Sequence, residues 1–372
     1  MESPSVLDFE FLLADIPGEN PAGVDLREDY SPRAVYRVLK DVRAAARAAE
    51  RNAAWETEES AGAKADWSPI LKQAPQVLGT QSKDLEIAAW LLEALVREHG
   101  FAGLRDGFRL TCGLVERFWE HVYPLPDEDG LETRVAPLTG LNGVEGEGVL
   151  SPAIQNVPIT RGASVGPFHC GQYRQALELD RIDDPSKRSA RIAQGAASLQ
   201  DIQKAVAETP AEFFQTLRDD LTACSDAFEK LCVVLEEKCG KDASGYPLAP
   251  PSSNIRNALQ ACRETIDYLV QPSPASSRPD SAAASRDNVQ ATAGGSVPVD
   301  QIRSREDAFR ALLQVAEFFK RTEPHSPISY TLEQAVRWGR MPLPELLGEL
   351  VPEESTRGQI FKLVGIRPEP ES

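Results

Sequence analysis

A chain of 372 residues is longer than one ordinary single-core domain, so two or three domains are expected. The composition, 41% hydrophobic and 26% charged, is typical of globular proteins, and the net charge of −17 argues against nucleic acid as a partner, because neutralising phosphates takes a basic face. No apolar run approaches the length of a membrane span, and the first residues lack the basic and apolar regions of a signal peptide. We therefore expect a cytoplasmic protein without direct membrane insertion.

Residues 1–145 show helical patterns separated by short breaks. After a stretch crowded with turn-forming residues, Ser31 and Pro32 start a helix in which apolar residues recur every three or four positions. The same period predicts further amphipathic helices over residues 70–78, 85–95 and 104–118. The first helix also carries a basic stripe, opposite in sign to the chain as a whole, which we interpret as a solvated face: Arg43, Arg47 and Arg51. This part is predicted to be an amino-terminal helical domain.

Residues 146–180 carry no long helical period. Gly and Pro interrupt the sequence repeatedly, and the stretches 149–160 and 163–168 are candidates for short strands. We therefore expect an irregular connection between two helical parts of the chain.

Residues 181–270 contain three heptad-like apolar seams. They run over residues 192–206, 214–235 and 259–269, and the second is sustained for three heptads. Three such helices in series would bury one another as an antiparallel bundle, which is the interpretation we prefer. The alternative is that one seam pairs with another copy of the chain, and the pattern itself does not separate the two.

The six cysteines are scattered and include no Cys-x-x-Cys motif. Cys224, Cys232 and Cys239 fall on one stripe of the second seam, where buried thiols acting as small hydrophobes are a simpler interpretation than metal ligands. Disulfides are not expected in a reducing cytoplasm. No metal or other cofactor is predicted.

The carboxy-terminal part divides into a linker and a small module. Residues 271–300 are rich in Pro, Gly, Ser and Ala without an apolar period, which predicts a disordered linker. Residues 301–372 then show three short helices, of which the first opens with a capping box at Ser304 and the second ends at Gly339. A module of this size has little core of its own, so self-assembly would help to stabilise it. The predicted fold class of the whole chain is all-α.

Residues 321–339 hold an unusual density of His, hydroxyl, Pro and aromatic side chains. Glu323, His325 and Ser326 resemble a hydrolase set, but adjacent side chains diverge at the start of a helix and would have to be brought together by the fold. The sequence has no nucleophile elbow, phosphate-binding loop or dinucleotide-binding motif. Aromatic and Arg residues on a small module are typical of protein–protein contacts, so we predict an oligomer or partner interface formed by His325, Tyr330, Arg337, Trp338 and Met341.

Two blocks of this sequence resemble the TssA (ImpA-related) proteins of type VI secretion systems. The first block resembles the ImpA N-terminal domain and includes residues 18–27, the Asp66-Trp67 pair, residues 82–85 and the Phe118-Trp119 pair. The second is Glu323-Pro324-His325-Ser326-Pro327-Ile328-Ser329-Tyr330 with Ala335-Val336-Arg337-Trp338-Gly339, flanked by residues 303–308 and 341–346. The two blocks stand in the same order as in the family, and residues 180–300 are less diagnostic.

The resemblance implies a non-enzymatic assembly protein of a type VI secretion system. Such proteins form ring-like oligomers through the C-terminal region and support assembly of the baseplate, tail tube and contractile sheath in the cytoplasm. The partners would be other copies of the chain together with baseplate, tail-tube and sheath proteins, and the family offers no catalytic residues to carry over. The alternatives are a generic helical adaptor, or a hydrolase that uses His325 and Ser326.

Overall fold

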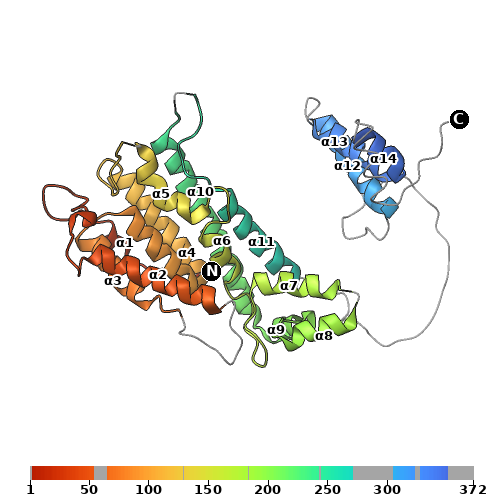
Figure 1. Cartoon of the computed structure of the whole chain (residues 1–372), viewed down its shortest axis with the longest axis horizontal. Helices are drawn as coiled ribbons and strands as arrows, with labels where there is room; N and C mark the ends of the chain where they lie inside the picture. Colours follow the sequence, from red (N-terminus) through yellow and green to blue (C-terminus); the bar gives the residue numbers. More distant parts are fainter. Residues whose placement is uncertain are drawn as a thin grey trace. The chain divides into compact units, whose positions relative to one another are not determined.

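The computed structural model describes residues 2–53, 65–128, 130–182, 184–242, 244–270, 305–322 and 327–350. Within these ranges the structure contains helices and no β-strands, which confirms the predicted all-α class. The chain divides into two compact units, Met1–Ser277 and Arg278–Ser372 (Figure 1). The predicted linker over residues 271–300 lies outside the described residues.

The first unit contains eleven α-helices and one short 3-10 helix within its described ranges. Their bounds are α1 Phe9–Leu12, η1 Leu26–Glu28, α2 Val35–Ala53, α3 Ser68–Thr80, α4 Leu85–Phe118, α5 Leu131–Asn142, α6 Leu150–Gln155, α7 Cys170–Asp180, α8 Pro185–Ala193, α9 Leu199–Glu208, α10 Ala211–Cys239 and α11 Ser253–Val270. The patterns predicted over residues 85–95 and 104–118 form the two halves of α4. These halves meet at a kink where Gly100 has φ 56°, a conformation that few residues other than glycine adopt.

The core of the first unit is built on α4 and α10, which lie side by side although far apart in sequence (Figure 1). The rings of Phe108 of α4 and Phe228 of α10 contact each other in a tilted arrangement, with centroids 4.9 Å apart and planes inclined by 45°. One hydrophobic cluster contains buried residues from both helices and from α2, α3, α5, α6 and α11. The predicted division into a domain over residues 1–145 and a separate bundle over residues 181–270 is therefore not what the structure has. Because α4 is apolar on most of its faces, it needs α10 as a partner.

The second seam is buried inside this core, so its packing is intramolecular. Its apolar positions face the cluster as the heptad period predicts: Phe214, Leu217, Leu221, Cys224, Phe228, Leu231 and Leu235. The first seam, however, is not one helix. It is divided between α8 and α9, because Gly195 between them has φ 92°, through which an α-helix cannot continue.

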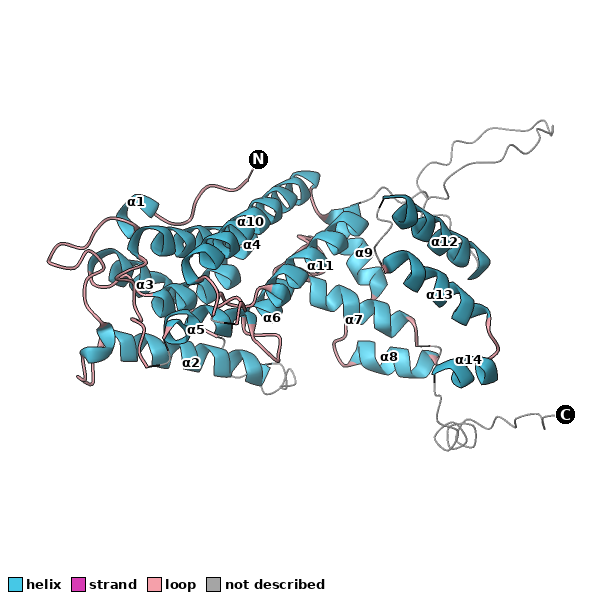
Figure 2. Ribbon diagram, turned by 90° about the horizontal axis from the view of Figure 1, so that it is seen from above, coloured by secondary structure: helices cyan, strands magenta, loops and turns pink. Residues whose placement is uncertain are grey.

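Residues 146–180, predicted as an irregular connection, include the helices α6 and α7. The predicted strands are wrong, because α6 occupies residues 150–155 and only a single bridge, Pro158 to His169, forms nearby. The His169 side chain caps α7 in a capping box with Gln172, a signal that sequence analysis overlooked. α7, α8 and α9 lie at the end of the unit away from α1 and α3 (Figure 2), where Tyr173, Ala176 and Ile202 form a small cluster of their own.

The second unit contains α12 Arg305–Thr322, α13 Ile328–Arg340 and α14 Leu343–Leu350 among its described residues. α12 packs against α13. The predicted capping residue Ser304 lies outside the described residues. Gly339 does not end α13, which continues to Arg340, and its role is instead to let α13 approach the ring of Phe309. A Cβ atom built on Gly339 would lie 2.6 Å from the ring carbon Cζ of Phe309, which is too close for any larger residue without rearrangement.

Candidate interaction surfaces

The predicted contact residues of the second unit differ in how far their side chains are exposed. Tyr330 on α13 is 62% exposed, and the Lys320 ammonium of α12 lies 5.9 Å from its ring centroid. Arg337 is exposed, whereas Trp338 and Met341 are half-buried. His325 lies outside the described residues. The structure therefore brings Arg337, Trp338 and Met341 together at the end of α13 and leaves Tyr330 near its start.

Glu349 of α14 is the residue that sequence analysis missed in this module. Its Oε2 accepts a hydrogen bond of 2.7 Å from the indole Nε1 of Trp338 and lies 3.2 Å from Nη2 of Arg337. The amide of Gln334 donates to the same oxygen at 3.3 Å. Trp338 and Arg337 thus have a role within the module, since they bind α14 to α13.

The Phe309 ring joins α12 to α13. The guanidinium carbons of Arg305 and Arg340 lie 5.3 Å and 5.5 Å from its centroid, which is cation–π distance, and Gly339 packs directly on the ring. The Arg305 guanidinium also donates to the Gly339 carbonyl. Two cationic side chains and one glycine therefore fix the crossing of the two helices.

Few of the described side chains in the second unit are buried. Ala316, Ser329 and Val336 are buried, whereas Leu313, Val315 and Phe318 of α12 are exposed apolar residues, with Val315 at 44%. A groove of about 410 Å³ begins at Leu313 and Val336 and runs to Met341. The groove is also lined by Glu333, Arg337, Arg340 and Glu345, so it combines apolar and charged side chains, as protein-binding surfaces do.

In the first unit, Arg27 and Asp84, two of the residues that resemble the ImpA N-terminal domain, belong to a charged network at the start of α4. Asp84 is fully buried and caps α4 by accepting hydrogen bonds from the backbone N–H groups of Glu86, at 2.8 Å, and Ile87, at 3.1 Å. Arg27 donates to Asp84 and to Glu86, each at 2.7 Å, and its guanidinium lies 4.8 Å from the Tyr36 ring centroid. Burial and the hydrogen bond to Glu86 raise the pKa of Tyr36. These residues attach the amino-terminal segment to α4.

Lys83, beside this network, is fully buried. Its ammonium donates to the backbone carbonyls of Leu12 at 2.8 Å and Leu78 at 2.7 Å, and no carboxylate pairs with it among the described residues. Burial lowers the pKa of Lys83 to about 8. The side chain therefore links α1 and α3 to the start of α4.

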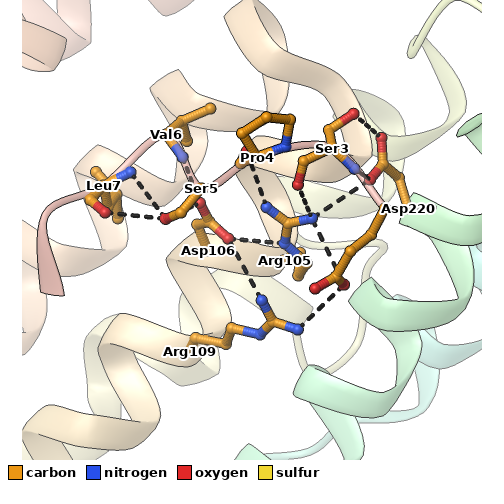
Figure 3. Close-up of polar contacts among 10 residues, drawn as sticks. Ser3, Pro4, Ser5, Val6, Leu7, Arg105, Asp106, Arg109 and Asp220 are labelled. Atoms are coloured by element: carbon orange, nitrogen blue, oxygen red, sulfur yellow. Dashed lines mark hydrogen bonds and ion pairs between the residues drawn. The ribbon is translucent and has the colours of Figure 1, made fainter.

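The first residues of the chain are held by Arg105, which is 1% exposed (Figure 3). Its guanidinium donates to Asp106 of the same helix at 2.7 Å, to the Ser3 carbonyl at 2.8 Å and to Asp220 of α10 at 3.3 Å. Asp220 in turn accepts from the backbone N–H and the hydroxyl of Ser3, at 2.7 Å and 2.6 Å. Charge-assisted bonds of this kind are the stronger ones, so the network connects the amino terminus, α4 and α10.

The side chains that the sequence suggests for catalysis lie outside the described residues. Among the described residues, no three His, Cys, Asp or Glu side chains gather in a way that could hold a metal ion. All six cysteines are buried, among them Cys224, Cys232 and Cys239 as predicted. Glu323, His325 and Ser326 lie outside the described residues. No helix in the described ranges is long and apolar enough to cross a membrane.

Known proteins resemble this chain over most of its length. A family model described as ImpA, N-terminal, type VI secretion system, matches residues 13–143. The chain is 27% identical to the type VI secretion system component TssA1 of Pseudomonas aeruginosa over 361 residues, which are 94% of this chain and 96% of that protein.

A solved structure, the N-terminal domain including the conserved ImpA_N region of the TssA component from Burkholderia cenocepacia, is also similar. It superimposes with a TM-score of 0.57 at 27% identity and covers 70% of this chain and 93% of its own. The likeness in fold thus extends beyond the residues that the family model matches. This agrees with a first unit in which α10 and α11 complete the core around α4.

Proposed function

Because this chain belongs to the TssA family of type VI secretion system proteins, we propose that it is a non-enzymatic assembly component that forms a ring-like oligomer through its second unit. In this role it acts in the cytoplasm and supports assembly of the baseplate, tail tube and contractile sheath. Its partners are other copies of the chain and the proteins of those structures.

The observation that carries the oligomer proposal is the exposure of apolar side chains on α12, with Val315 and Phe318 on one face and Leu313 on the opposite side of the helix. A module whose described core is so small gains stability when such a surface is covered, and repeated identical contacts in a closed ring convert weak pairwise binding into stable assembly. We assign Tyr330, Arg337, Trp338, Met341 and His325 to the same contact region. Arg337 and Trp338 act there partly through Glu349, which holds α14 in place.

Mass photometry of four chains tests this proposal. The full-length chain is expected to form a large oligomer. A chain ending at residue 277 is expected to form a species with fewer subunits. Val315→Lys in the full chain places a charge on the apolar surface and is expected to dissociate the oligomer. The matched control is Val233→Lys on α10, another helical valine, which is 52% exposed but lies in the first unit. A monomeric full-length chain, or equal effects of the two substitutions, would refute the ring proposal.

The helical adaptor remains the second candidate, and it makes the opposite prediction for the same measurement. An adaptor with an inert tail is monomeric at full length, and both lysine variants leave its mass unchanged. Nothing in the described residues favours the hydrolase alternative, whose His325 and Ser326 lie outside them.

A further inference from the structure

A groove of about 460 Å³ opens on the first unit between α2, α4 and α5. Arg43 and Arg47 of α2 form one wall, Trp90 and Glu93 of α4 form the floor, and α5 forms the other wall with small and apolar residues that include Gly140. We call this the α2–α5 groove. All the residues that line it belong to the first unit, so the proposal below does not depend on the proposed ring.

Glu93 is fully buried at the floor of the α2–α5 groove, and only half of its carboxylate is satisfied. Its Oε1 accepts from Nε of Arg43 at 2.7 Å and lies 2.6 Å from Nη2 of the same guanidinium. Its Oε2 has no hydrogen-bond donor among the described residues, and Nε of Arg47 lies 4.0 Å from it. A buried carboxylate oxygen without a donor is costly, so a donor supplied by a ligand would be stabilising there.

Arg47 is the second unsatisfied group. Its guanidinium makes no hydrogen bond within the described residues, and the lining of the groove desolvates it, which lowers its pKa. The helix that carries it, α2, has five basic and two acidic residues in a chain whose net charge is −17. An anionic group entering the groove would therefore meet a cation whose ion pair within the described residues, to Glu93, is long at 4.0 Å.

The α5 wall is suited to an apolar side chain. No atom lies within 4 Å of a Cβ built on Gly140, and Pro137 one turn earlier also lines the groove. The Trp90 ring forms the floor beside them, with the Arg43 guanidinium 5.9 Å from its centroid. The groove thus offers a cation, a hydrogen-bond acceptor and an apolar surface next to one another.

We propose that the α2–α5 groove binds an acidic peptide segment of a partner protein. A carboxylate of the segment pairs with Arg47, a backbone N–H donates to Oε2 of Glu93, and a neighbouring apolar side chain packs between Trp90 and Gly140. A phosphate fits less well, because it supplies no N–H donor for Oε2 of Glu93 and brings more negative charge close to that carboxylate than a peptide carboxylate does. The sequence pattern predicts that the basic stripe of α2 is a solvated face. In this proposal Arg43 and Arg47 of that stripe instead form part of a docking surface.

Peptide selection on the full-length chain tests this proposal. A library of random heptapeptides displayed on phage is selected against the immobilised protein, and enriched sequences are synthesised with blocked ends and titrated. We expect the enriched peptides to contain Asp or Glu beside an apolar residue. Arg47→Glu and Arg47→Gln should weaken their binding about tenfold or more, since a charged contact in a partly desolvated groove is lost.

A pair of glycine variants separates the groove from a general charge effect. Gly140→Phe fills the groove and should abolish binding, whereas Gly140→Ala adds only a methyl group in open space and should bind within about twofold of the unmodified chain. If Gly140→Phe does not fold, as judged by circular dichroism, the two Arg47 variants decide the question. Enrichment of non-acidic peptides, no enrichment, or unchanged binding to the variants would overturn the proposal. So would a change in the oligomer mass with Gly140→Phe, because the occupant would then be a second copy of this chain.

Discussion

The Arg105 guanidinium of α4 lies 3.3 Å from the Asp220 carboxylate of α10, and 115 residues of sequence separate the two. Both side chains are buried, and Ser3 completes the contact by donating twice to Asp220 (Figure 3). This ion pair lies at the junction of two segments that the sequence pattern assigns to different domains. Its presence in the core shows that these segments fold as one unit.

Asp220→Ala is expected to lower the free energy of unfolding of the first unit by about 2–3 kcal/mol. The substitution removes three hydrogen bonds and leaves the buried Arg105 with Asp106 as its main carboxylate partner. Urea unfolding followed by circular dichroism measures the change. Asp226→Ala, an exposed aspartate on the same helix, is the control and should alter the free energy of unfolding by less than about 0.5 kcal/mol. Equal losses in the two variants would contradict the assigned role of the network.

The helices of this fold were predictable because their signal is local, whereas their partners were not. The apolar period of residues 214–235 correctly indicates a helix and its buried face. The same period cannot say which surface covers that face, and a bundle with its sequence neighbours satisfies it as well as packing on α4 does. Gly195 and Gly100 show a second limit. Each breaks a helix through a positive φ, yet a glycine inside an apolar period is compatible with an unbroken helix.

Lys83 is expected to make the stability of the first unit depend on pH in the alkaline range. The pKa of the amine is about 8 in the folded chain and has its ordinary value of 10.5 when unfolded. Below pH 8 both states are protonated and Lys83 adds no pH dependence. Between about pH 8 and 10.5 the unfolded state holds the extra proton, so the free energy of unfolding rises with pH.

The comparison of the unmodified chain with Lys83→Met isolates this effect. Lys83→Met leaves the carbonyls of Leu12 and Leu78 without their donor, so it should be less stable at every pH. The difference between the two chains is expected to widen by about 1–2 kcal/mol from pH 7.5 to pH 9.5. Urea unfolding at several pH values provides the measurement. Parallel curves for the two chains would show that the Lys83 amine titrates as it does in water.

The place of Arg337 and Trp338 on a helix was predictable, but their contacts were not. Trp338 and Arg337 are conspicuous by residue type, and both do lie near the end of α13. Glu349 has no comparable signal, because a glutamate in a short amphipathic helix is ordinary. Only the folded arrangement of α13 and α14 reveals that it accepts the Trp338 indole hydrogen bond.

Glu349→Ala is expected to loosen α14 from α13. The variant loses the acceptor for Gln334, Arg337 and Trp338, and because these contacts are partly exposed we expect a cost of about 1 kcal/mol. Hydrogen exchange measured by mass spectrometry should then show about fivefold faster exchange in α14. Glu345→Ala, an exposed glutamate one turn earlier in α14, is the control and should exchange as the unmodified chain does. No difference between the variants would mean that Glu349 does not hold α14.

Gly339→Ala and Gly140→Ala should have opposite effects on stability, although both place alanine in a helix, where it is intrinsically favoured by about 1 kcal/mol over glycine. At Gly140 the new methyl group meets open space, so the first unit should become more stable by about 0.5–1 kcal/mol.

At Gly339 the methyl group would lie 2.6 Å from the Phe309 ring, which is held between Arg305 and Arg340. The packing of α13 on α12 should therefore weaken by about 1–2 kcal/mol. Hydrogen exchange in α12 and α13 measures the second effect, and Phe309→Leu combined with Gly339→Ala should restore part of the protection by removing the ring atoms that clash. Slower exchange in Gly339→Ala alone would show that the ring moves aside without cost and that the close approach does not fix the helix crossing.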